Sequence, residues 1–573
     1  MTQNQTTWLR LVTLLAIGIF LAACSPSGSL SKSTTKIQNP PAANSGSINN
    51  SPSVKNGPQP VLANQTQIPD PKAGIWISSA VPDGVSKSLK MPNGFNLVTD
   101  PGRADLHLEI GADNVVSTWV YALVAPFPSV TDGVASIDLK NFWLTGQNSG
   151  MPIQKILVDQ NTAKVFSQIW GAPAEAVVSI LPDDQILNQA WETMDAWAIV
   201  PFDQIGPRWK VLLVDGISPI RKDFQLDSYY LSVPISIHEM TPKAKGFFQQ
   251  LDKEQFVIRS NRDSDLLTTV IVTGTTALVR ATAHLMEVNG MDYPGQDIRD
   301  WLLQADITHV SNEIAFTPTC PAPFTLPNSK LVFCSKPEYF QLLQDIGVKV
   351  VELTGDHLSD WGPDAIRYTI NLYNQAGMKY YGGGLNLADG EKPLLLEHNG
   401  TKIAFIGCNA KPPGYALASA TSPGAVHCDP AYMLPEITSL KEQGYQVITT
   451  FQHLEYYSYK ANPILVTDFE KAAEAGSVIV SGSQAHQPQA MEFDNNSFLH
   501  YGLGNLFFDQ YNEGFPERQA FIDRHVFYNG HYINTELLTI MFVNQALPRP
   551  MTTSERQDLL TTIFQASNWK LGE

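Results

Sequence analysis

The sequence has little charge and, above all, little positive charge. Only 16% of its 573 residues are charged, and 55 acidic residues outnumber 38 basic ones, which gives a formal net charge of −17 at pH 7. Such a surface repels phosphate backbones and anionic lipid headgroups, so we expect no nucleic-acid partner. An anionic small molecule or polymer stays compatible with this charge, because one bound cation can locally outweigh a diffuse negative surface.

The apolar run near the N terminus is too short to span a membrane. It covers residues 11–23, follows Arg10 and ends in Leu21-Ala22-Ala23-Cys24. Its length is typical of a signal-peptide core, and its last four residues resemble the bacterial lipobox, whose cysteine is acylated. We therefore predict a signal peptide over residues 1–24 and a lipid anchor on Cys24, at the cell surface or in the periplasm. The alternative is an uncleaved anchor with a chance cysteine, which also places the bulk of the chain outside the cytoplasmic membrane.

Residues 25–74 contain no aromatic side chain and are rich in Ser, Asn, Pro and Gln. A segment of that composition cannot bury enough apolar surface to offset the entropy lost on ordering. We predict a disordered tether between the lipid anchor and the folded part.

Cysteine is scarce as well, since the chain has five. With Cys24 acylated, an even number remains, which suggests disulfides in an exported protein. A thiolate metal cluster is not expected, because no Cys-x-x-Cys pair occurs. Three pairings are open, and proximity along the chain favours Cys320 with Cys334 and Cys408 with Cys428.

The length favours two folded domains after the tether. Residues 75–245 alternate candidate strands, such as 106–110 and 197–201, with helical patterns, and we predict a smaller α/β domain. The segments 121–131, 198–203 and 229–234 loosely resemble parts of periplasmic substrate-binding proteins. The alternatives are a solute receptor for a transporter and an α/β spacer that binds no ligand.

Residues 266–510 show a clearer alternation of strands and helices. Candidate strands cover residues 267–272, 306–310, 348–353, 402–407 and 446–450, and a helix over 364–376 ends at Gly377. Repeated strand–loop–helix units predict a parallel or mixed sheet covered on both faces. Residues 511–573 add strands over 531–543 and a helix over 554–565, and we predict a C-terminal extension that packs on this domain.

Polar side chains follow the strands of this second domain. Open α/β sheets place their ligands at the carboxyl ends of strands. Carboxylates and imidazoles that converge from several loops suit a divalent cation. The residues are Thr275, Asn312, Glu313, Asp356, His357, Asp360, His453, Glu455, Gln484 and His486.

The order of several short motifs in this region resembles that of the CapA family, the bacterial capsule and poly-γ-glutamate synthesis proteins. The matching residues are Gly274 with Arg280, Asn312 with Glu313, Asp356-His357-Leu358-Ser359-Asp360, Glu455-Tyr456, Gly482 with His486, and Leu503-Gly504-Asn505. The family is similar to the binuclear metallophosphatases. The resemblance therefore implies an α/β fold: a calcineurin-like metallophosphatase-type α/β sandwich, here preceded by the smaller α/β domain.

The resemblance also implies roles for individual residues. Glu313, Asp356, His453 and His486 would hold a divalent metal, such as manganese, zinc or iron. His357 and Asp360 would be catalytic, with His357 as the general acid in a metal-assisted hydrolysis or transfer. Arg280 and Asn312 would bind the substrate, an anionic polymer or a small molecule.

The sequence departs from the family pattern at metal positions. Thr275 stands where the family has an aspartate, Gln484 stands near an expected histidine, and Phe451 stands four residues before Glu455. Each metal position would then have lost a ligand. The alternative hypothesis is a non-catalytic binding or sensing lipoprotein with a degenerate phosphatase-like domain.

Overall fold

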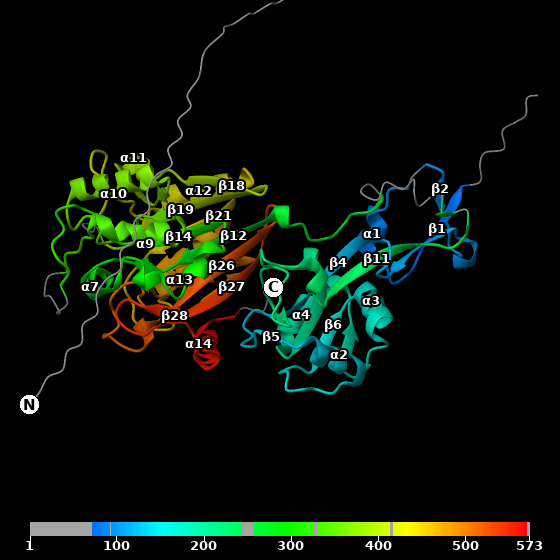
Figure 1. Ribbon diagram of the computed structural model, residues 1–573. Coiled ribbons are helices and arrows are strands. Elements are labelled where there is room, and N and C mark those ends of the chain that lie inside the picture. Colours follow the sequence, from blue (N-terminus) through cyan, green and yellow to red (C-terminus); the bar gives the residue numbers. More distant parts are fainter. Residues whose placement is uncertain are drawn as a thin grey trace, which may run out of the picture. The chain divides into compact units, whose positions relative to one another are not determined.

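The computed structural model describes residues 72–91, 93–242, 244–245, 256–324, 331–412 and 416–569 (Figure 1). The predicted signal peptide, Cys24 and the predicted tether up to residue 71 lie outside the described residues. Within the described ranges, no helix has both the length and the apolar character that a membrane crossing needs.

The first part of the chain forms a nine-stranded mixed sheet in the order β2-β1-β3-β11-β4-β8-β6-β7, with β9 paired to β4. Its strands are β1 (Ala73–Ile77), β2 (Phe95–Leu97), β3 (Leu106–Ile110), β4 (Val115–Pro126), β6 (Lys155–Val158), β7 (Val178–Ile180), β8 (Ala196–Pro201), β9 (Trp209–Val211) and β11 (Ser232–Glu239). The helices whose bounds lie within the described residues of this part are α1 (Asp83–Ser88), α2 (Ser136–Thr145), α3 (Gln160–Trp170) and α4 (Asp183–Thr193), and β5 (Gly133–Val134) pairs with β10 (Leu213–Val214).

Strands β11 and β4 lie between two groups of parallel strands in this sheet, β2-β1-β3 and β8-β6-β7, and β4 is the more central of the two beside β8. Strand β4 runs antiparallel to β11 on one side and to β8 on the other. Its residues from Trp119 to Pro126 are all buried. A nearly continuous apolar run of this kind is typical of a central strand covered on both faces.

The second part of the chain contains two larger sheets. One has the order β16-β15-β14-β12-β26-β27-β28, with β13 paired to β14 and β25; the other has the order β18-β19-β21-β22-β24-β23. The strands of the first are β12 (Leu267–Thr273), β13 (Thr275–Thr276), β14 (Ile307–Asn312), β15 (Val348–Glu352), β16 (Lys379–Tyr381), β25 (Asn505–Phe507), β26 (Gln519–Tyr528), β27 (His531–Phe542) and β28 (Pro548–Pro550). The strands of the second are β18 (Leu394–His398), β19 (Thr401–Asn409), β21 (Gln446–Gln452), β22 (Ser477–Ser483), β23 (Met491–Asp494) and β24 (Ser497–His500).

Eight helices accompany these two sheets among the described residues. They are α7 (Arg280–Asn289), α8 (Arg299–Leu303), α9 (Phe340–Asp345), α10 (Pro363–Ala376), α11 (Leu387–Gly390), α12 (Pro430–Glu442), α13 (Pro463–Ala475) and α14 (Thr553–Ala566). A small pair joins β17 (Gly383–Gly384) to β20 (Gly424–Ala425). Short 3₁₀ turns cover Pro101–Arg103, Phe202–Gln204, Leu226–Ser228, Ser264–Leu266, Tyr293–Gly295, Pro337–Tyr339 and Pro516–Arg518.

The two sheets pack face to face, with helices on the outer faces (Figure 1). Val270 and Val272 of β12 share a core with Phe405 of β19 and Ile448 of β21, whereas Ile271 joins the opposite core with α7, α9 and α10. This follows from the two-residue period of a strand, whose neighbouring side chains point to opposite faces. Helices α12 and α13 cover the far face of the other sheet. The predicted α/β sandwich preceded by a further α/β part is confirmed.

The segment after Gln510 belongs to the sandwich itself. Strand β26 pairs with β12 over seven residues, and β27 pairs with β26. Ion pairs from Arg221 to Glu536 and from Asp132 to Arg556 connect the first part of the chain to β27 and α14. Both disulfides expected from proximity, Cys320–Cys334 and Cys408–Cys428, are present.

Candidate functional site

Six polar side chains meet at the carboxyl ends of parallel strands in both sheets. Three of them follow β14, β15 and β19, one is the last residue of β21, and two follow β22. We call this group the strand-end cluster: Glu313, Asp356, Lys411, Gln452, Gln484 and His486. All except Lys411 are less than 9% exposed.

Glycines bring the strand ends close enough for this meeting. A Cβ atom on Gly355, beside Asp356, would lie 2.4 Å from the Cα of Glu313. A Cβ atom on Gly274 would lie 1.9 Å from the carbonyl oxygen of Gly504. Backbone atoms cannot yield to such contacts, so these positions accept only glycine.

Lys411 is the cation of the cluster. Its Nζ lies 2.7 Å from Oδ2 of Asp356 and 3.9 Å from Oε2 of Glu455, and its side chain is 13% exposed. With the Gln484 amide oriented so that its nitrogen faces Glu313, the amide oxygen accepts from Lys411 Nζ at 3.1 Å. Gln452 Nε2 donates to Glu313 Oε1 at 3.1 Å and to Asp356 Oδ1 at 3.2 Å.

The pKa values of the two carboxyl groups of the cluster are shifted in opposite directions. Burial and the neighbouring Asp356 carboxylate raise the pKa of Glu313. Burial also acts to raise the pKa of Asp356, but the hydrogen bond with Glu313 and the charge of Lys411 outweigh it and lower this pKa to about 2. Asp356 is therefore a carboxylate at neutral pH, and Glu313 takes up a proton before Asp356 does, which avoids two negative charges side by side.

Asn505 holds the imidazole of His486 in one orientation. The imidazole Nδ1 lies 2.8 Å from Oδ1 of Asn505, and Asn505 Nδ2 donates to the carbonyl oxygen of His486 at 3.1 Å. The second bond fixes the orientation of the amide, so Nδ1 of the imidazole carries the proton. Burial lowers the pKa of His486, which keeps the ring neutral. The backbone of His486 is in the left-handed region, with φ of 54°.

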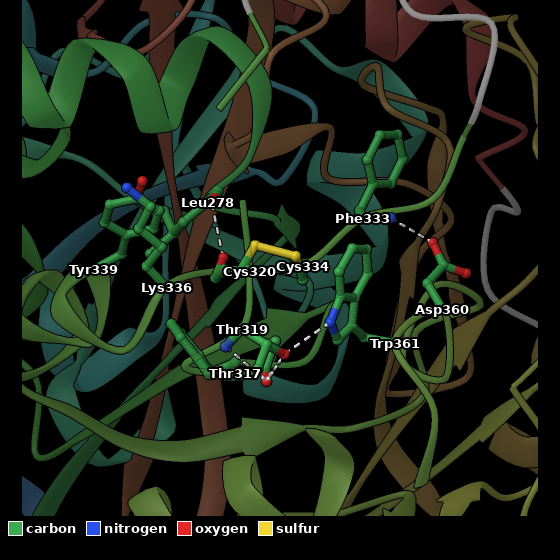
Figure 2. Close-up of a disulfide and its surroundings, with 12 residues drawn as sticks. Leu278, Thr317, Thr319, Cys320, Phe333, Cys334, Lys336, Tyr339, Asp360 and Trp361 are labelled. Carbon is green, nitrogen blue, oxygen red and sulfur yellow. Dashed lines mark hydrogen bonds between the residues drawn. A yellow bond between two sulfur atoms is a disulfide. The ribbon is translucent and has the colours of Figure 1, made fainter. Parts of the chain in front are cut away.

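His357 lies beside the cluster and is anchored by Asp360. Its Nδ1 is 2.7 Å from Asp360 Oδ2, and the same oxygen accepts the backbone N–H of Phe333 at 2.7 Å. Figure 2 shows Asp360 and Phe333 next to the Cys320–Cys334 disulfide, where Trp361 donates to Thr319. The predicted catalytic pair is thus a hydrogen-bonded pair tied to the disulfide segment.

Aromatic rings connect the two histidines and Arg280. Phe333 packs on His357 with ring centroids 4.6 Å apart, and Phe508 packs on His486 at 5.0 Å. The Arg280 guanidinium lies over both phenyl rings, 5.2 Å from the centroid of Phe508 and 5.8 Å from that of Phe333. The structure therefore places Arg280, the predicted substrate-binding arginine, beside Phe333 and Phe508, the rings that pack on His357 and His486.

Two predicted site residues have their partners elsewhere. His453 Nε2 lies 3.2 Å from Asp468 on α13, and burial lowers its pKa. Asn312 Nδ2 donates to the carbonyl of Ile314 and to the hydroxyl of Tyr373 on α10, at 2.7 Å each. His453 therefore contacts a helix, and Asn312 supports the core beneath the cluster.

Comparison with known proteins relates the region of the strand-end cluster to a known family. Residues 269–510 match the family model described as bacterial capsule synthesis protein PGA_cap. This region is similar to the CapA family, and we call residues 269–510 the CapA-type domain. The capsule biosynthesis protein CapA of Bacillus anthracis is 23% identical over 302 residues, which cover 51% of this chain and 72% of that protein. The PGA biosynthesis protein CapA of Bacillus subtilis is 24% identical over 242 residues, 41% of this chain and 62% of that protein, so less than two thirds of this relative is matched.

Solved structures give weaker likenesses. The NAD nucleotidase NadN of Haemophilus influenzae matches 54% of this chain and 57% of its own at 10% identity, with a TM-score of 0.27. An ABC-type phosphate transport receptor from Vibrio cholerae matches 31% of this chain and 92% of its own at 11% identity, with a TM-score of 0.24. Scores this low carry no argument about the CapA-type domain or the part before it.

The residues of the CapA-type domain do not fit a divalent metal as they are arranged. Among the described residues, no three His, Cys, Asp or Glu side chains are grouped so that they could hold a metal ion. Of the four predicted ligands, Glu313, Asp356 and His486 belong to the cluster and His453 does not. The Asp356 oxygen that a metal would need is instead in contact with the Lys411 ammonium. The prediction of bound manganese, zinc or iron is not favoured by this geometry.

Sequence reasoning missed Lys411, Gln452 and Asn505 as members or supports of the CapA-type site. A usable signal existed for two of them: Gln452 is the last residue of β21, and Lys411 comes two residues after β19. Both strands end at the same edge as β22, which carries Gln484 and His486 beyond it. Asn505 belongs to the matching Leu503-Gly504-Asn505 motif, which by itself indicates no role, and the structure shows that it orients His486.

A separate cavity of about 640 Å³ lies in the part before the CapA-type domain. Its charged lining residues are Asp83, Asp159, Asp183, Asp203, Lys87 and Lys164. Lys87 is paired with Asp83 at 3.2 Å. Burial and the charge of Asp159 raise the pKa of Asp183. The electrostatics of this cavity oppose an anionic solute.

Proposed function

We propose that this protein is a cell-surface lipoprotein that takes part in making or anchoring an anionic capsule-type polymer such as poly-γ-glutamate. The match of residues 269–510 to the capsule synthesis family is the observation that carries this proposal. Two curated relatives, both named for capsule or PGA biosynthesis, support it. The lipobox-like sequence before Cys24 supports the membrane anchor.

We propose that Arg280 binds the negatively charged groups of the polymer. It lines a cavity of about 380 Å³ with Val279, Phe333, Tyr339 and Trp361, beside the Cys320–Cys334 disulfide. Among the described residues of this lining, Arg280 alone is charged. Asp509 forms an ion pair with Arg280, with 3.7 Å between Oδ2 and Nε, and Nε of Arg280 has no hydrogen bond to any described residue. A guanidinium in apolar surroundings binds a ligand carboxylate more strongly than one in water does.

A binding role does not require a metal ion in the strand-end cluster, whereas metal-assisted catalysis does. We favour binding without metal-assisted hydrolysis, because Lys411 already contacts the Asp356 carboxylate. The second candidate is metal-assisted hydrolysis or transfer, with His357 as the general acid. Glu313, Asp356 and His486 follow strands that end at one sheet edge, but the described side chains are not arranged to hold a metal ion, so this candidate would require them to move.

The polymer role is tested in cells that express the full chain from its own gene. Arg280→Met should reduce the surface-bound anionic polymer several-fold and increase the released fraction, measured as glutamate after acid hydrolysis of each fraction. Arg367→Met, an exposed arginine on α10, is the matched control and should leave both fractions unchanged. Immunoblots confirm equal protein levels. A strain without the gene that keeps its polymer in amount and location would overturn the proposal.

The lipid anchor is tested separately. Metabolic labelling with a palmitate analogue should label the wild-type protein and not Cys24→Ser, and the variant should leave the membrane fraction. A wild-type chain that takes up no label would contradict the anchor and leave the polymer role open to its own test.

A further inference from the structure

The side chain of Lys411 is surrounded by oxygen atoms from three different loops. Asp356 follows β15, Glu455 follows β21 and Gln484 follows β22, and their oxygens lie 2.7, 3.9 and 3.1 Å from Lys411 Nζ. Carboxylate and amide oxygens that converge from separate loops are the environment that proteins provide for hard cations. An ammonium has three N–H donors, so it can donate hydrogen bonds to carboxylate and amide oxygens that surround it in this way.

The backbone that carries Lys411 is held in place by both sheets. The N–H of Lys411 donates to Oδ1 of Asn409 at 2.8 Å, and Nδ2 of Asn409 donates to the carbonyl of Thr354 at 2.7 Å. The N–H of Ala410 donates to the carbonyl of Gln452 at 2.8 Å. The Cys408–Cys428 disulfide adds a covalent tie at the end of β19. These ties fix the backbone from which the Lys411 side chain extends toward Asp356.

Two other carboxyl oxygens of the cluster accept N–H donors, whereas Oε2 of Glu313 has no hydrogen-bond partner in the described part of the chain. Gln452 Nε2 donates to Glu313 Oε1 and to Asp356 Oδ1, and the Gln484 amide donates to Glu313 Oε1 at 2.8 Å. A divalent ion placed among these groups would face the partial positive charge of the amide hydrogens and the full charge of Lys411 at close range. It would also have to displace the ammonium from Asp356.

We infer that the ammonium of Lys411 takes the position of a divalent cation in the strand-end cluster, so that the CapA-type domain is a metal-independent member of a fold otherwise suited to metal chemistry. Lys411 holds the loops after β15, β21 and β22 together, as a metal ion would. This inference deepens the binding role proposed above and rests on it for its functional meaning. Metal content is measured on purified protein and polymer retention in cells, so the two can fail separately.

The test is metal analysis of the detergent-solubilised full chain, purified without a polyhistidine tag and dialysed against Mn²⁺ or Zn²⁺. Wild type should carry no stoichiometric metal, and neither should Lys402→Ala, which removes an exposed lysine from the same strand, β19. Lys411→Ala should gain about one equivalent, because its removal leaves Asp356 and Glu455 without their cation. Adding Asp356→Asn to that variant should abolish the gain.

Wild-type protein with stoichiometric metal that is lost in Asp356→Asn would overturn the inference. A folded Lys411→Ala that binds neither ion would overturn it too, since the cluster would then be no cation site. If Lys411→Ala is not recovered folded, the wild type decides. An unfolding midpoint unaffected by Mn²⁺, Zn²⁺ and EDTA supports the inference, and a midpoint raised by either ion, but not in Asp356→Asn, contradicts it.

Discussion

The imidazole of His357 is hydrogen-bonded to the carboxylate of Asp360, with Nδ1 2.7 Å from Oδ2. The same carboxylate oxygen accepts the N–H of Phe333, the residue next to Cys334 (Figure 2). One side chain thus orients a candidate catalytic residue and also holds the segment that forms one wall of the Arg280 cavity.

Asp360→Ala should cost more stability than His357→Ala. Asp360→Ala removes both hydrogen bonds and leaves the Phe333 N–H without its acceptor, so it should lower the free energy of unfolding by about 2 kcal/mol. His357→Ala removes one hydrogen bond and should lower it by about 1 kcal/mol. Urea unfolding of the full chain measures both, with the exposed Asp558→Ala as a control for surface substitutions. Equal losses would show that the Phe333 bond does not contribute.

The Cys320–Cys334 disulfide should stabilise the wall of the Arg280 cavity. It closes a loop with a sequence separation of 14, for which chain entropy predicts about 3 kcal/mol. The double variant Cys320→Ser/Cys334→Ser should unfold at a lower urea concentration and retain less polymer, since Phe333 and Cys334 line that cavity. A variant with the wild-type midpoint would contradict this role.

Gly355→Ala should damage the strand-end cluster directly. The new Cβ would lie 2.5 Å from the carbonyl oxygen of Glu313, and only a backbone shift could relieve that contact. We expect a loss of about 3 kcal/mol, at the upper end for overpacking. Gly206→Ala is the matched control, because its Cβ would meet no heavy atom within 4 Å. Similar unfolding midpoints for the two variants would refute the close approach.

His525 should make the protein less stable in mild acid. Burial, together with the charges of His500 and His309, lowers its pKa from 6.5 to about 4, although Asp523 acts in the opposite direction. Between these values the unfolded chain binds a proton and the folded one does not, so stability falls as the pH drops from 6.5 to about 4. The total loss in the free energy of unfolding over this pH range is about 3 kcal/mol.

The measurement is urea unfolding of wild type and His525→Gln across that pH range. The variant should lose less stability on acidification, by an amount that reaches its full size near pH 4. Parallel stability curves would show that this imidazole titrates alike in both states.

Much of the fold was predictable because local patterns dominate in long elements. The helix expected over 364–376 is α10, Pro363–Ala376, and the strands expected over 267–272 and 531–543 are β12 and β27 within a residue. Hydrophobic periodicity and a terminal glycine mark such elements independently of their surroundings. The place of β26 and β27 inside the sandwich was not predictable, since pairing with β12 joins residues far apart in the chain.

Some residues of the candidate site were likewise predictable from the sequence, and others were not. Ordered motifs and strand ends were enough to bring Glu313, Asp356, His486, His357 and Arg280 into one region. The cation among them was not foreseeable, because Lys411 is an ordinary lysine in a loop until β19 is laid beside β21. The same holds for His453, whose contact with Asp468 depends on how α13 packs.

The amino-acid sequence was enough to set the sign of the protein's charge and the alternation that makes an α/β sandwich, and it favoured the disulfide pairing and the edge at which polar groups collect. Which of those groups touch is a property of the folded chain alone. The reason is that contacts between loops of two facing sheets depend on strand order and register, which are set by pairings across hundreds of residues. At this site that geometry put an ammonium, rather than a gap for a metal, against Asp356.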